Sequence, residues 1–493
     1  MSIRVQVATG LKWQLIGVAG KQLLSMVVFM LLARLLGPAA FGLIALVGVF
    51  LGVINMFVDQ GIGMALIQRP GLTLEHIHTA FWFNLACAVT LCLATVGAAP
   101  WIASLFHEPR LTPLLRWASL QLIIGALASI HTNLFIKSMD FRRPVIRNLL
   151  ATSGGGIVGL AMALGGCGVW ALIGQQLSAA LVGTVFLWQA STYRPALTFS
   201  FARLRELFHV SFSVFASSML WFFSSRLDQI VIGRFVGVQP LGLYAMAAKF
   251  PDFAKALANT PIAEVTLPAL AKLQDDHVRM RRAICRGMEL NALVAFAAYV
   301  GLAAVAGDLI LFLLGQQWSG AGELCSLLSL YALILTLQVF FYPAMLAAGG
   351  AGKYLTLNIA QAVGVLIGCL VGIQFGVNYL VIGLIANTLL MSVPAMILLH
   401  RQIGLRARDY WTPCVVPALA SGVMWVVVYA ISCTLPSDGG RLLRLLCEVL
   451  GGGIVYLGVV FGMAPAILRE FAISISHALR PPSPTSSVDQ SIP

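Results

Sequence analysis

Charge is what this sequence most lacks. Of its 493 residues only 10% are charged, while 59% are hydrophobic and the mean hydropathy is +0.91. A soluble protein of this length needs far more charged surface, so that class is excluded. Long apolar runs recur between Trp13 and Met463, and roughly 20 such residues cross about 30 Å of hydrocarbon. The sequence therefore predicts a membrane protein.

Motifs for disulfide, metal or nucleotide chemistry are also missing. The nine cysteines are scattered without a C-x-x-C pair, and the eight histidines form no cluster with cysteine or carboxylate. Disulfides and metal sites are therefore not expected. The segment GGAGK at 349–353 lacks the spacing of a phosphate-binding loop. We predict no cofactor and no nucleotide site.

One glycine-rich segment needs its own interpretation. The stretch GGGIVG at 154–159 matches G-x-G-x-x-G, but it lies within an apolar helical pattern. A nucleotide site would require a preceding strand and a helix N-terminus aimed at phosphate. Gly155 and Gly159 instead form a GxxxG pair, which allows two membrane helices to approach closely. Close helix packing is the prediction for this segment.

The apolar runs predict an all-α membrane protein with about fourteen transmembrane helices. Their lengths, and the absence of alternating ten-residue strands, favour helices over a barrel. The expected spans are 13–33, 41–65, 79–103, 117–136, 149–165, 169–190, 208–232, 241–269, 290–314, 324–347, 355–375, 377–399, 411–433 and 443–465. The fifth and sixth are short enough to be one segment. The N-terminus lacks a cleavage signal and should be retained, and the proline- and serine-rich tail 480–493 should be disordered.

Lysine and arginine in the loops predict the orientation. With the N-terminus in the cytoplasm, 21 of the 31 basic residues fall in inside segments and 6 in outside segments. Cytoplasmic loops carry such an excess, so both termini and the tail are predicted to be cytoplasmic. The net charge of +13 is thus a topology signal. Spread over many short loops, it does not indicate a nucleic-acid partner.

A basic, glycine-punctuated segment occurs twice. ARLLGPAAFGL at 33–43 and GRFVGVQPLGL at 233–243 share four residues at an offset of 200, namely Arg34/Arg234, Gly37/Gly237, Gly42/Gly242 and Leu43/Leu243. Further residue pairs match at an offset of 210, and the last of these pairs is Gly166 and Gly376. Gly61 and Pro261 are also matched, so each copy places a helix-breaking residue in its second helix. Both are predicted flex points.

The repeat predicts the domain organisation. We expect an N-terminal six-helix lobe over 1–200, a second over 201–400, two further helices within 401–479, and the tail 480–493. Six spans is an even number, so the lobes should be related by a pseudo-two-fold axis along the membrane normal. Chance similarity among apolar helices is the alternative.

Ionisable residues at membrane depth suggest the functional surface. Such residues are costly and usually face a cavity. Four basic residues are not accounted for by loops, and we interpret them as a cavity surface: Lys21, Arg226, Lys249 and Lys255. Four acids are candidates for ion coupling or for the cavity: Asp59, Asp228, Asp252 and Glu264. Structural ion pairs, such as one between Lys249 and Asp252, are the alternative.

An ordered set of motifs resembles a known family. The segments ARLLGPAAFGL, FVDQGIGMALIQRP, MDFRRPVIRN, SSRLDQIVIGRFVGVQPLGLYAMAAKF and LGQQWSGA are similar to those of the Wzx-type polysaccharide flippases. The resemblance is narrower to the branch with the colanic-acid exporter, within the multidrug/oligosaccharidyl-lipid/polysaccharide exporter superfamily. It covers nearly the whole chain to about residue 400, whereas the last two spans match only in number.

The resemblance implies a function. A member of this family would be a fourteen-helix protein of the bacterial inner membrane that flips undecaprenyl-pyrophosphate-linked oligosaccharide units by alternating access. Such units serve exopolysaccharide, capsule or O-antigen synthesis. The cavity cations would then hold the pyrophosphate, because lower dielectric strengthens the Coulomb attraction. The polymerase and the chain-length regulator of the same pathway become candidate partners.

Two alternatives stay open at this point. A multidrug or cation antiporter of the same superfamily would have two similar lobes, but would favour carboxylates over basic residues in its cavity. A membrane polysaccharide polymerase or ligase would need a catalytic group on the outer face. The predicted outer loops are short, the longest being about 100–116. We therefore expect a transporter and not an enzyme. The glycan and the energy source are not predicted.

The orientation is testable by labelling. In a chain without its native cysteines, single cysteines introduced near Pro109 and Ser437 should react with an impermeant thiol reagent added outside intact cells. Cysteines near Arg143 and Arg281 should be protected. Labelling of the Arg143 site from outside would contradict the predicted orientation.

Overall fold

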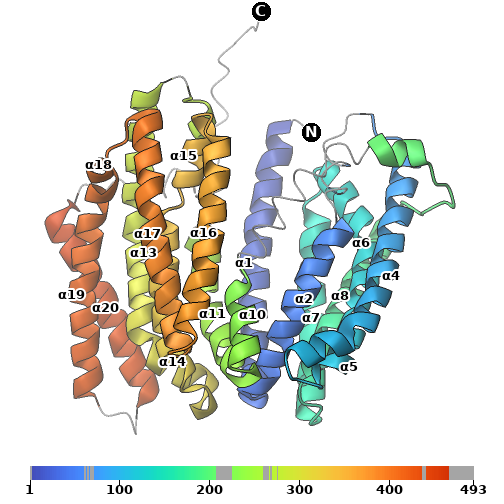
Figure 1. The fold of residues 1–493 in the computed structure, drawn as a ribbon, viewed down its shortest axis with the longest axis horizontal. Coiled ribbons are helices and arrows are strands. Elements are labelled where there is room, and N and C mark those ends of the chain that lie inside the picture. Colours follow the sequence, from blue (N-terminus) through green and yellow to red (C-terminus); the bar gives the residue numbers. More distant parts are fainter. Residues whose placement is uncertain are drawn as a thin grey trace, which may run out of the picture. The chain divides into compact units, whose positions relative to one another are not determined.

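The computed structural model consists of helices joined by turns and loops in its described part, which comprises residues 3–59, 63, 66, 71–206, 225–258, 266, 269–274, 276–435 and 440–465. Figure 1 shows the helices. They are α1 (Ile3–Leu35), α2 (Pro38–Asp59), α4 (Leu74–Leu105), α5 (Leu111–Ala118), α6 (Leu120–Lys137), α7 (Arg142–Leu164), α8 (Trp170–Ala190), α10 (Leu227–Phe235), α11 (Val238–Ala258), α13 (His277–Leu314), α14 (Ala321–Leu337), α15 (Phe341–Ala347), α16 (Ala351–Gly372), α17 (Val377–Ile403), α18 (Ala407–Trp411), α19 (Val415–Thr434) and α20 (Arg441–Met463).

The predicted all-α membrane fold is confirmed. Among the described residues, eleven helical segments are long and apolar enough to span a membrane. Each corresponds to one predicted span, and the pair 149–165 and 169–190 forms two separate helices, α7 and α8. The span 13–33 lies within α1. Most of 208–232 and the end of 241–269 lie outside the described residues, so the count of fourteen stays a prediction.

The chain divides into two compact units. Unit 1 comprises Met1–Lys249, Ile310–Cys325 and Ala362–Asn387. Unit 2 comprises Phe250–Leu309, Ser326–Gln361 and Thr388–Pro493. Within unit 1, α4, α6 and α8 run alongside one another (Figure 1), and within unit 2, α19 packs on α20. The lobe boundaries proposed from the repeat remain a prediction.

The GxxxG pair in α7 packs against α8, as the sequence predicts. A Cβ added at Gly155 would lie 2.6 Å from the Ala179 Cβ, and one at Gly159 would lie 2.8 Å from the Gln175 Cβ. On a neighbouring face, Gly156 meets Val28 of α1. Glycine therefore lets α7 approach two helices closely, which agrees with packing and not with a nucleotide site.

The matched glycines Gly166 and Gly376 both lie in turns between helices, Gly166 two residues after the end of α7 and Gly376 directly before the start of α17. They follow α7 and α16 with φ angles of +76° and +123°. Only glycine enters this region without steric cost, and a helix often terminates there. Both matched positions thus require glycine for their backbone conformation.

The duplicated corner makes a reciprocal contact within unit 1. Pro38 begins α2, where its fixed φ and missing N–H are compatible with a helix start. A Cβ on Gly42 of α2 would overlap the Val238 carbonyl, and a Cβ on Gly242 of α11 would overlap the Pro38 carbonyl. The two helices therefore touch backbone to backbone through the two copies of one motif. A two-fold relation between the copies would produce such a contact.

The matched arginines at this corner have different partners. Arg34, in the last turn of α1, donates from Nε to the Leu313 carbonyl (2.5 Å) and from Nη2 to the Phe312 carbonyl (2.6 Å). It thereby satisfies carbonyls at the C-terminal end of α13 that lack helical partners. Arg234, in the last turn of α10, instead donates to His107 Nδ1 at 3.1 Å.

The glycine contact predicts a stability difference between two alanine variants of α2. Gly42→Ala should destabilise the protein by about 1–3 kcal/mol, because the added methyl group forces the helices apart. Gly48→Ala is the matched control, since a Cβ there meets no atom within 4 Å and alanine is the better helix former. The measurement is thermal unfolding of the purified protein. Equal melting temperatures would show that the contact is loose.

Candidate functional site

All four predicted cavity cations lie on helices or at a helix end, with exposed side chains. Lys21 is on α1, Arg226 is the N-cap of α10, and Lys249 and Lys255 are on α11. Exposed cations on membrane helices are unusual, because contact with hydrocarbon is costly. The exposure is compatible with a surface that meets water or a polar ligand.

Within unit 1 the structure brings Lys249 next to α1. Its Nζ lies 5.8 Å from the ring centre of Phe29, a cation–π distance. Phe29 is two helical turns from Lys21, about 12 Å along the α1 axis, and at 100° per residue the two positions differ by about 80°. Contact with α1 is therefore shown for Lys249, and a shared surface of Lys21 and Lys249 stays a prediction.

A series of aromatic rings fixes the position of Phe29. Its ring packs edge-on against Phe41 of α2 at 5.3 Å, and Phe41 packs likewise against Trp318 at 5.5 Å. The Trp318 indole N–H donates to the Ala33 carbonyl at 2.9 Å, which anchors the series to the end of α1. The ring beneath Lys249 is thus held by three helical segments of unit 1.

Asp228 links α10 to α11. Its carboxylate accepts hydrogen bonds from the Tyr244 hydroxyl and from the Gln229 N–H, the latter at 2.8 Å. Arg226 lies close enough to act electrostatically on the same carboxylate. Asp228 therefore offsets part of the charge beside Arg226 and ties the two helices together, a structural role in addition to the predicted one.

The other predicted residues are only partly described. Asp252 is exposed on α11, as is Lys255, and α11 continues through Pro251 to Ala258. Asp59 is the last residue of α2, and its side chain lies outside the described set. Glu264 and the predicted flex points Gly61 and Pro261 also lie outside the described residues.

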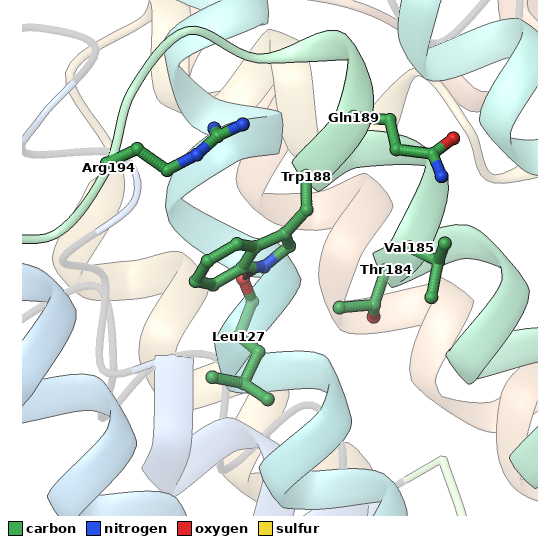
Figure 2. A pocket seen from close by; sticks show the side chains of 6 residues that line it. All are labelled: Leu127, Thr184, Val185, Trp188, Gln189 and Arg194. Carbon is green, nitrogen blue, oxygen red and sulfur yellow. Dashed lines mark hydrogen bonds between the residues drawn. The ribbon is translucent and has the colours of Figure 1, made fainter.

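Sequence reasoning missed a pocket in unit 1 (Figure 2). This cavity of about 390 Å³ is lined by Leu127, Thr184, Val185, Trp188, Gln189 and Arg194. The Trp188 indole donates to the Leu127 carbonyl at 3.0 Å, so α6 and α8 form its walls. A second cavity, of about 540 Å³, lies beside Arg34 and the turn after α13. Neither cavity is lined by a predicted site residue.

The segment after α8 fixes the polar edge of the Trp188 pocket. Arg194 donates from Nη1 to the carbonyls of Ser191 (2.7 Å) and Tyr193 (2.8 Å), and its guanidinium lies 6.0 Å from the Trp188 ring centre. Burial raises the pKa of Tyr193 to about 12, so its hydroxyl stays neutral. Largely apolar walls with one cation at the edge suit an apolar chain with an anionic end. The tryptophan, tyrosine and arginine at a helix end were the available signal.

Comparison with known proteins agrees with this description. The profile of a family described as "Polysaccharide biosynthesis protein" matches residues 31–323. The chain is 28% identical to the succinoglycan biosynthesis transport protein ExoT of Rhizobium meliloti over 68% of each chain. It is 23% identical to the teichuronic acid biosynthesis protein TuaB of Bacillus subtilis over 92% of this chain and 95% of that one.

Solved structures show the same fold. The lipid II flippase MurJ matches with a TM-score of 0.74 and 14% identity, over 92% of this chain and 99% of that one. A multidrug transporter of the MATE family, in the MOP superfamily, matches with a TM-score of 0.64 and 15% identity, over 78% and 94%. The resemblance drawn from the motifs is thereby confirmed. The family profile covers more than half of the sequence, and the chain belongs to this family of polysaccharide biosynthesis proteins.

Proposed function

We propose that this protein flips undecaprenyl-pyrophosphate-linked oligosaccharide units across the bacterial inner membrane by alternating access. The observation that carries the proposal is the set of exposed cations in spans predicted from the sequence, of which Lys21, Arg226 and Lys249 belong to unit 1. The names of the relatives, a succinoglycan transport protein and a lipid II flippase, support a lipid-linked glycan as the cargo class.

The chemistry of such a cargo fits these side chains. A glycan and its pyrophosphate cannot cross hydrocarbon without a polar path, whereas the lipid tail can stay in the bilayer. Cations in a partly dry environment attract the pyrophosphate more strongly than they would in water. The carboxylates Asp228 and Asp252 near these cations moderate that attraction, which allows release.

The described carboxylate of the predicted outer loop is poorly suited to general acid catalysis. In the predicted outer loop, Glu108 pairs with Arg110, with 2.6 Å between Oε1 and Nε. The hydrogen bond from Arg110 lowers the pKa of Glu108 despite an opposing effect of burial. This carboxylate is therefore a poor general acid at neutral pH. Transport remains the better account, and partnership with a polymerase or a chain-length regulator is part of the proposal.

The cation surface predicts graded losses of export. Neutral variants of Lys21, Arg226, Lys249 and Lys255, each changed to Gln, should lose about 1.5–3 kcal/mol of binding to the pyrophosphate where the bond is desolvated. That corresponds to roughly a ten- to hundredfold loss in affinity. Lys249→Arg should be milder than Lys249→Gln, because the charge is kept in a larger, planar group.

The assay is surface polysaccharide in a strain lacking its own exporter, with the amount of membrane protein measured in parallel. Arg441→Gln is the matched control, because Arg441 is exposed at the start of α20. Arg444, which the sequence also places in the last outer loop, is unsuitable because it pairs with two acids. Normal export by all four neutral variants would contradict a cationic binding surface.

A further inference from the structure

An acid–arginine–acid cluster lies within unit 2, apart from the residues proposed to bind cargo. Arg444 of α20 donates from Nη2 to Asp308 Oδ2 of α13 at 2.8 Å, and from Nε to Glu448 Oε1 at 3.1 Å. One guanidinium therefore holds two carboxyl groups. Both helices are long and apolar enough to span the membrane, and ionisable groups within such segments are usually functional.

Glu448 is the buried member of this cluster. Its side chain is 1% exposed, against 16% for Arg444 and 23% for Asp308. Oε1 bonds to Arg444, whereas Oε2 is buried without a hydrogen-bond partner among the described residues. An ionised oxygen buried in this way would be strongly destabilising.

The missing partner is explained if Glu448 carries a proton. Asp308 is the other carboxyl group that acts on Glu448, and two carboxylate oxygens cannot bond to each other unless one of them is protonated. A proton on Oε2 would convert that atom from an unsatisfied acceptor into a donor toward Asp308. The cluster would then contain one cation and one anion, and its charge would be balanced.

Apart from the cluster, the charged residue of α20 among its described residues is Arg441, which is exposed at the helix start. α19, which packs on α20 (Figure 1), contains no Asp, Glu, Lys, Arg or His, and its titratable residues, Tyr429 and Cys433, are exposed. Apart from Asp308, the charged residues of α13 lie in its first four turns, from His277 to Glu289. The charge state of Glu448 therefore depends on Arg444 and Asp308.

We propose that Glu448 and Asp308 form a proton-binding site, and that exchange of this proton couples transport to a proton gradient. The coupling, though not the site, rests on the proposed flippase function. Asp308 and Arg444 are partly exposed and lie near the end of α13 and the start of α20, so water can reach the pair from that end. On release the proton passes from Glu448 Oε2 to water, and the second carboxylate is left beside Arg444. On uptake the reverse occurs.

Infrared spectroscopy of the protein in phospholipid bilayers tests the site without transport. The wild type should show the carbonyl absorption of a protonated carboxyl group that disappears as the pH is raised. Glu448→Gln should lose this band, and Asp308→Asn should change the pH at which it disappears, because the pair titrates as a unit. Glu323→Gln, which removes an exposed acid of α14, is the matched control and should keep the band. A band that is absent, independent of pH or retained in Glu448→Gln would overturn the site.

Coupling is tested in vesicles that contain the protein and a lipid-linked oligosaccharide. A gradient of one pH unit should shift the distribution of this lipid between the leaflets by up to about tenfold per proton, and Glu448→Gln should abolish the shift. Flipping that ignores the gradient would overturn the coupling and leave the flippase function intact. A titrating band in a protein that flips no glycan would contradict the flippase function and support the proton site.

Discussion

The contact between Gly42 and Gly242 is the constraint on which the proposed cargo surface depends. It brings α2 and α11 together at backbone distance, which no residue with a side chain would permit. Phe41, next to Gly42, packs on Phe29, and Lys249, two turns beyond Gly242, lies over the same ring. The duplicated corner thus positions the Lys249 cation relative to α1.

The ionisable residues discussed above form two groups that differ in exposure and in ion pairing. Lys21, Arg226 and Lys249 in unit 1 are exposed cations and belong to the proposed surface for an anionic ligand. In the Asp308–Arg444–Glu448 cluster of unit 2, the arginine pairs with both acids, and the Glu448 carboxyl group is buried. An exposed cation can exchange a large ligand, whereas a buried carboxyl group can exchange only a small one. The proposed cargo surface and the proposed proton site share no residue, so a mutation in one leaves the residues of the other unchanged.

Sequence reasoning predicted what depends on local pattern. Span lengths and the GxxxG packing of Gly155 and Gly159 follow from hydropathy and backbone sterics. Contacts between distant residues were not predictable. Arg444 was assigned to a loop, because nothing in its neighbourhood reveals Asp308, 136 positions earlier. Likewise, the repeat marked Gly42 and Gly242 as equivalent without showing that they touch.

The central claim is that cations of the membrane helices recognise the pyrophosphate of the cargo. Its most direct test is to measure binding of one oligosaccharide, attached to the same polyprenyl chain through a pyrophosphate or through an uncharged linkage, to the purified protein in bilayers. The account predicts that the pyrophosphate form binds at least about tenfold more tightly, as expected for desolvated, charge-assisted hydrogen bonds. Equal affinity for the two forms would contradict it and assign recognition to the glycan or the lipid chain.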